Sequence, residues 1–84
     1  MRRSWTHEEE GILIDAVATS IRSGRTMSEG MVDAATRIRR TPAACAYHFY
    51  NQIDRSDDPR MEAIAEAKRE RLWQKIREYP GARR

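Results

Sequence analysis

The chain has 84 residues, of which 39% are hydrophobic and 35% charged, with a formal net charge of +3. A chain this short forms one domain with a small core, because it buries only about 60% of its unfolded surface. No apolar run approaches the about 20 residues that cross a bilayer, and the single cysteine excludes an internal disulfide. We therefore expect a reduced, cytoplasmic protein (nucleoid-associated if bacterial) with no signal peptide, membrane segment, bound metal, cofactor or small-molecule substrate.

Arginine dominates the basic residues, with 14 arginines against two lysines. The arginines gather at Arg2-Arg3, at Arg37-Ile38-Arg39-Arg40 and at Arg83-Arg84. A rigid guanidinium fork suits phosphate and guanine, so these clusters favour a nucleic-acid partner. A GC-rich coding sequence would enrich arginine equally well, and composition alone leaves both interpretations open.

The first predicted helix covers residues 6–22. Thr6 and Glu9 have the spacing of a capping box, in which each side chain bonds the other residue's backbone amide. Apolar residues then recur every fourth position at Leu13, Val17 and Ile21, and Gly24 is typical of a helix end.

The second predicted helix covers residues 26–39, again behind a capping box of Thr26 and Glu29. Its apolar stripe is Met27, Met31, Ala34 and Ile38. Gly30 lies inside the helix, where glycine costs about 1 kcal/mol relative to alanine, so this helix is the least secure.

The third predicted helix covers residues 41–53. Thr41 is a good N-cap and Pro42 suits the first helical position, while Cys45, Phe49 and Ile53 form the apolar stripe. Only a tight turn around Arg40 fits between this helix and the second. Two short helices joined by a tight turn are typical of a helix-turn-helix.

The fourth predicted helix starts at Asp58-Pro59 and ends near Glu78. One side carries apolar residues interrupted by Lys68, and the set is Met61, Ala65, Leu72, Ile76 and Tyr79, with Trp73 adjacent. This helix has three interpretations: it folds back onto the other three, pairs with its copy in a homodimer, or stays free until a partner binds.

Residues 5–53 resemble a Myb/SANT repeat. Trp5-Thr6-His7-Glu8-Glu9-Glu10, followed by Leu13 and Val17, resembles the family's W-T-x-E-E-D-x-x-L-x-x-x-V opening. The stretch from Arg40-Thr41 to Ile53 resembles R-T-x-x-Q-C-x-x-R-W-x-N-x-L, and the family's three tryptophans would fall at Trp5, Met31 and Phe49. The nearest variety is the RsfA-type prespore regulator. The resemblance implies a Myb-like three-helix unit in residues 1–54. The C-terminal amphipathic helix in 55–84 lies outside the resemblance and is predicted from its own apolar pattern, which completes an all-α fold.

The same resemblance implies binding to double-stranded DNA, with the third helix in the major groove. We expect base reading by residues on its exposed face, namely Ala43, Ala46, Tyr47, Tyr50 and Asn51. We expect phosphate contacts from the clusters and helix start, namely Arg2, Arg3, Arg39, Arg40, Thr41 and His48. DNA-reading repeats carry Lys, Asn or Arg on this face, whereas here the face has Asn51 but no Lys or Arg, so a SANT-type adaptor that docks another regulator or a polymerase subunit is the alternative.

Two further expectations concern chemistry and assembly. Cys45 and His48 lie three residues apart, but a cysteine in an apolar stripe is usually a small core residue, so no catalysis is expected. One Myb-like unit buries little DNA surface, and a specific regulator gains from dimerising. We therefore expect a homodimer whose contact includes Leu72, Trp73, Ile76 and Tyr79.

Overall fold

The computed structural model describes residues 4–78, and within that range the chain is all-helical with no strand. Four α-helices follow one another along the chain: α1 (His7–Arg22), α2 (Met27–Ile38), α3 (Pro42–His48) and α4 (Glu62–Glu78). A short π-helix, Phe49–Ile53, continues α3, and a 3-10 turn, Pro59–Met61, precedes α4. The predicted all-α class and four-helix order are confirmed.

Local capping sets the helix starts. The Thr6 hydroxyl accepts from the Glu9 amide at 3.0 Å, and the Thr6 amide donates to Glu9 Oε1 at 3.0 Å. Thr26 and Glu29 form the same reciprocal pair at 3.1 and 2.8 Å. Both predicted capping boxes are confirmed, and each satisfies amides that a helix start otherwise leaves unpaired.

The three predicted apolar stripes converge on one core. Its buried members from α1, α2 and the α3 region include Leu13, Val17, Ile21, Met31, Ala34, Ile38, Cys45, Phe49 and Ile53. Gly30 is buried where α2 crosses α1: a Cβ built there would lie 2.7 Å from Val17 Cα and 2.9 Å from the Ala16 carbonyl oxygen. The glycine that weakens α2 locally therefore permits the closest approach of the two helices.

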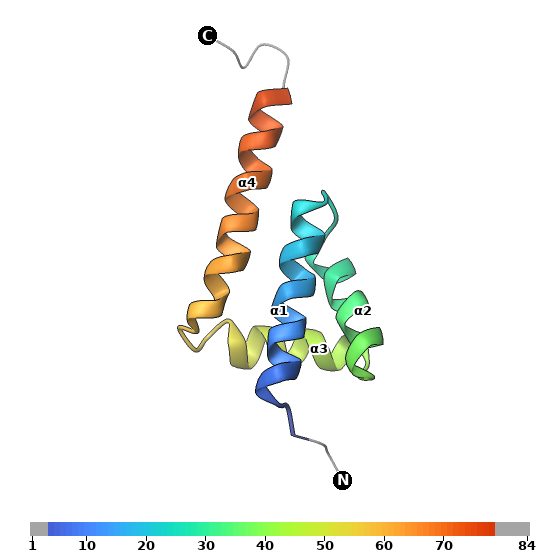
Figure 1. The fold of residues 1–84 in the computed structure, drawn as a ribbon. Coiled ribbons are helices and arrows are strands. Elements are labelled where there is room, and N and C mark those ends of the chain that lie inside the picture. Colours follow the sequence, from blue (N-terminus) through green and yellow to red (C-terminus); the bar gives the residue numbers. More distant parts are fainter. Residues whose placement is uncertain (1–3, 79–84) are drawn as a thin grey trace.

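The first half of α4 packs alongside α1, and the two helices run in the same direction (Figure 1). Ile64 is 2% exposed and Ala67 is fully buried, and both belong to the common core. An ion pair between Arg22 and Glu70, 3.1 Å long, marks where α1 ends beside α4. Beyond that point α4 continues without a neighbour in Figure 1.

The packing of α4 corrects the sequence analysis in one respect. The buried contacts with the core come from Ile64 and Ala67, which the predicted stripe omitted, while Met61 of that stripe is partly buried against the core. Leu72, Trp73 and Ile76 are instead 57%, 61% and 42% exposed. The fold-back interpretation thus holds for the first half of α4. It does not hold for Leu72, Trp73 and Ile76, which stay exposed. Tyr79 lies outside the described residues.

Candidate nucleic-acid interface

The exposed side of α3 and the π-helix presents the predicted base-reading residues. Tyr47 and Tyr50 are 68% and 46% exposed, and Ala43 and Asn51 are exposed beside them. Ala46 is half-buried and packs against the core, so it lies at the edge of this face. The opposite side of the same segment holds the buried side chains of Cys45, Phe49 and Ile53, which fix the orientation of the exposed face.

The third helix is not a continuous α-helix to Ile53, as the sequence predicted. From Phe49 to Ile53 it widens into a π-helix, and the Asp54 amide donates to the Phe49 carbonyl at 2.8 Å. Asn51 supports this turn through its side chain, whose Nδ2 donates to the Tyr47 carbonyl at 3.0 Å. That bond uses one of the two Nδ2 hydrogens and leaves the Asn51 carbonyl oxygen available as an acceptor. Single π turns are frequent at functional sites.

Two arginines flank the start of α3. Arg37 and Arg39 are exposed, and neither makes an ion pair with any residue of the 4–78 range. Arg39 ends α2 in the left-handed conformation, with φ 61°, which turns the chain into α3. Thr41 caps α3, because its hydroxyl accepts from the Ala44 amide at 3.0 Å. The Thr41 side chain is therefore committed to the helix start.

Arg40 is engaged inside the molecule. Its guanidinium lies over the Trp5 ring, 4.3 Å from the ring centroid, and its Nη2 donates to Glu9 Oε1 at 3.0 Å and to the Ser4 carbonyl at 2.9 Å. The Arg40 side chain is only 12% exposed. It ties the turn before α3 to the start of α1 and has little surface to offer a phosphate.

His48 packs against the same tryptophan. Its ring stacks on Trp5 at 4.1 Å between centroids and 3° between planes, and Nε2 lies 2.7 Å from Glu10 Oε2. Partial burial of Glu10 opposes its ionisation, but hydrogen bonds from His48 and Arg60 outweigh this and lower the Glu10 pKa. His48 and Arg40 thus both pack on Trp5 and bond acidic residues of α1, so neither of these expected phosphate ligands is presented to a phosphate.

This Trp5 cluster, which consists of Trp5, Arg40, His48, Glu9 and Glu10, was not predicted from the sequence. Trp5 was assigned to the first of the family's three tryptophan positions, whereas in the structure it is half-buried and contacts a cation and an aromatic ring. No local spacing joins residues 5, 9, 40 and 48, so only the folded chain reveals the arrangement. Arg2 and Arg3, also expected to bind phosphate, lie outside the described residues.

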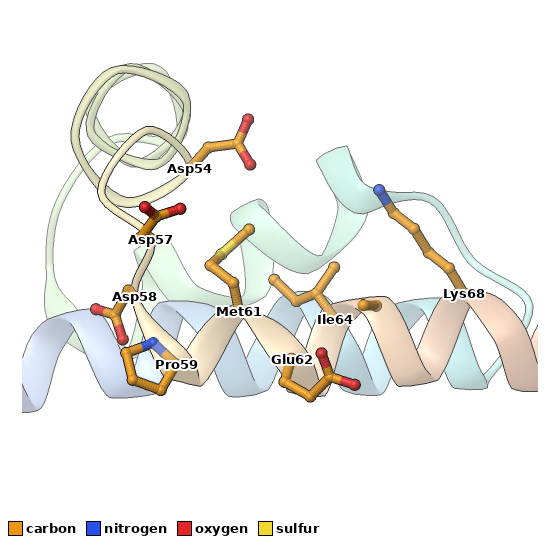
Figure 2. Close-up of a pocket in the computed structure, with 9 residues that line it drawn as sticks. Asp54, Asp57, Asp58, Pro59, Met61, Glu62, Ile64 and Lys68 are labelled. Carbon is orange, nitrogen blue, oxygen red and sulfur yellow. The ribbon is translucent and has the colours of Figure 1, made fainter.

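An acid-rimmed groove lies beside α4, between its first turns and the segment from the π-helix. The groove has a volume of about 450 Å³. Met61, Ile64 and Ala65 form its apolar floor, Lys68 closes one end, and acidic residues line the rest: Asp54, Asp57, Asp58 and Glu62. In Figure 2 the side chains of Met61, in the turn before α4, and of Ile64, on α4, point toward this space, with Asp54 and Asp57 on the far wall. This groove was not predicted from the sequence.

Within residues 4–78 no group of three His, Cys, Asp or Glu side chains could hold a metal ion. None of the helices in this range is long and apolar enough to cross a membrane. Cys45 is fully buried, and burial raises the pKa of its thiol, as expected of a small core residue.

Comparisons with known proteins return no match: no protein-family model fits the chain, and no curated protein or solved structure is significantly similar to it. The Myb/SANT resemblance therefore stays a prediction from the residues quoted above.

Proposed function

We propose that this protein binds double-stranded DNA sequence-specifically to regulate transcription, with α3 and its π-helical continuation in the major groove. The observation that carries the proposal is the two-sided α3 segment. One side anchors Cys45, Phe49 and Ile53 in the core, and the other leaves Tyr47, Tyr50 and Asn51 exposed in a fixed arrangement. A rigidly held helix with exposed hydrogen-bonding side chains is what direct base readout requires.

Each exposed group has a defined chemical role in this proposal. Asn51 can present its carbonyl oxygen and an amide hydrogen together to the edge of adenine. The Ala43 methyl and the tyrosine rings can contact thymine methyl groups, and the tyrosine hydroxyls can bond phosphate. Arg37 and Arg39 supply exposed positive charge at the start of α3, where neighbouring phosphates would pass.

A second function is favoured by a specific observation on the same face. No lysine or arginine lies between Pro42 and Ile53, and the two tyrosines are large side chains that remain exposed. Tyrosine-rich surfaces without lysine are also typical of protein–protein contacts. In that case the face would dock another regulator or a polymerase subunit, as an adaptor does.

Fluorescence anisotropy against a pool of random duplexes at several salt concentrations separates the two functions. For DNA binding, log affinity should fall linearly with log salt, and Arg39→Ala should flatten the slope by about 0.9 per lost phosphate contact. Arg25→Ala is the control, because Arg25 pairs with Asp33 and belongs to the connection between α1 and α2, which lies at the opposite end of α2 from α3 (Figure 1). Absence of any salt-dependent binding favours the adaptor.

Selection of a preferred duplex from the same pool then tests base reading. Asn51→Ala should cost about 1–3 kcal/mol of discrimination and leave weak general binding intact. Circular dichroism is needed alongside, because Asn51 also bonds the Tyr47 carbonyl. If a folded Asn51→Ala and a folded Tyr47→Ala retain the full preference, α3 does not read bases.

A further inference from the structure

The acid-rimmed groove and the exposed apolar residues of α4 share one side of that helix. Met61, Ala65, Leu72 and Ile76 recur at intervals of four, seven and four, which places them along one face. The first two line the groove, whereas Leu72 and Ile76 lie beyond the end of α1 and are 57% and 42% exposed. The face therefore consists of a recess in its first half and an apolar ridge in its second.

The charges along this face are opposite in its two halves. Asp54 and Asp57 on the groove wall make no ion pair with any other residue of the described range. Lys75 follows Lys68 by seven residues and so lies on the groove side of the ridge, where it is exposed and likewise makes no ion pair within residues 4–78. Arg77, two residues further on, points to the opposite side of α4.

We propose that the occupant of this face is a second copy of the chain, whose α4 runs antiparallel to the first. Pairing the two helices at the level of Glu70 sets Ile76 of one copy beside Ile64 and Ala65 of the other. The same alignment sets Leu72 beside Lys68 and brings Lys75 to the wall of Asp54 and Asp57. The contact is two-fold symmetric, so each copy fills the groove of the other.

Self-complementarity is the reason for choosing a second copy. The same face of the chain carries the acidic recess and an apolar ridge with an exposed lysine, and such opposite charges suit a two-fold contact between identical surfaces. In a lone chain Leu72, Trp73 and Ile76 would together form an exposed apolar patch. The acidic wall repels phosphate, so DNA is a poor occupant of this groove. This proposal is independent of DNA binding by α3.

Light scattering coupled to size exclusion, on the intact chain without DNA at micromolar to submillimolar concentrations, provides the test. The intact chain should have the mass of a dimer. Lys75→Glu should raise the dimer dissociation constant by about tenfold or more, since each two-fold dimer loses two attractive contacts and gains repulsion. Arg77→Glu, the same charge change on the opposite side of α4, should leave the dissociation constant unchanged.

Exchanging the charges of Asp54 and Lys75 tests whether these two residues face each other across the dimer contact. The double variant with Asp54→Lys and Lys75→Glu should recover most of the lost dimer, because it restores an opposite pair across the contact. Leu72→Asp should yield a folded monomer, since Leu72 is exposed and outside the core. A monomeric intact chain, equal disruption by Arg77→Glu, or no recovery in the double variant would each overturn the proposal.

Discussion

Gly30 determines how closely α1 and α2 approach, although helix propensity disfavours glycine at its position. The atoms a Cβ would meet belong to the backbone of α1, at Val17 Cα and the Ala16 carbonyl oxygen, and cannot swing away. Gly11, inside α1, differs completely: a Cβ there would meet nothing within 4 Å. Gly11 thus has only the local cost of a glycine inside a helix. Gly30 has the same cost, but it also permits the close packing of α1 and α2.

We predict that Gly30→Ala destabilises the fold, because α1 and α2 must move apart and loosen the core around Val17. Gly11→Ala should stabilise it by up to about 1 kcal/mol, the propensity difference between the two residues in a helix. Urea denaturation followed by circular dichroism measures both changes in the free energy of unfolding. Stabilisation by Gly30→Ala would show that the helices are not packed as closely as described.

The positions of some residues could be predicted from the sequence, and those of others could not. Phe49, Cys45 and Met31 are buried as their spacing predicted, because apolar periodicity reports burial directly. Arg40 and His48 are equally fixed, yet their polar side chains look like surface groups in the sequence. Their partners Trp5, Glu9 and Glu10 lie more than 30 residues away, and only the tertiary fold brings them together.

At the scale of elements, Arg60 fastens the start of α4 to the start of α1. Its guanidinium donates to Glu10 Oε1 at 3.0 Å and to the His7 carbonyl at 3.3 Å, while Nε bonds both Asp58 oxygens at 3.0 and 3.1 Å. The hydrogen bonds from the Arg60 side chain and backbone amide lower the pKa of Asp58 from 3.8 to about 2. Asp58 and Glu10 thus share one cation at this junction.

This junction predicts a specific loss of stability in acid. A carboxyl group with a lowered pKa stabilises the fold fully above its unfolded pKa, and that contribution disappears as the pH falls through the folded value. For Asp58 this contribution to stability should be lost as the pH falls from about 4 to about 2. Asp58→Asn should therefore lower the unfolding temperature at pH 6 and make it less steeply dependent on pH below 4.

Thermal melts followed by circular dichroism from pH 2 to pH 7 provide the measurement for this acid series. Asp15→Asn is the control, since Asp15 is exposed on α1 and makes no ion pair within residues 4–78. An Asp58→Asn curve that runs parallel to wild type across the whole range would mean that the Arg60 junction does not contribute to acid sensitivity.

The positions at which the helices start were the part of the fold most readily predicted from the sequence. Thr6, Thr26 and Thr41 each signal a helix start through bonds within three residues, and all three occur as predicted. The π-helix after His48 and the contact face of α4 were not predicted. Both features depend on what the segment packs against in the folded chain. In α4, only some of the apolar residues are covered by the core, and the spacing in the sequence does not show which ones.

At the scale of the whole molecule, α4 divides into a part that the domain needs and a part that it does not. Ile64, Ala67 and Arg60 complete the core and the junction, whereas every residue from Leu72 to Glu78 is exposed. The division falls close to Arg71, next to the end of α1 at Arg22.

We predict that a chain ending at Arg71 keeps a cooperative melt close to that of the intact chain, whereas a chain ending at Ile53 does not. Removing Ile64 alone forfeits about 1.5–3 kcal/mol of burial, a large share of the about 5–15 kcal/mol typical of a domain. Melts at low micromolar concentration limit any contribution from self-association. Equal melting of the two shortened chains would place α4 outside the cooperative unit.

The parallel arrangement of α1 and α4 also has a consequence for the order in which the protein is made. α1 packs against both α2 and α4, so its surface is fully covered only after α4 has been made. Synthesis proceeds at about 5–20 residues per second, and the side of α1 that α4 covers waits several seconds for residues 60–67 to leave the ribosome. During that interval the nascent chain exposes an apolar helix face, on which a chaperone can act before the domain closes.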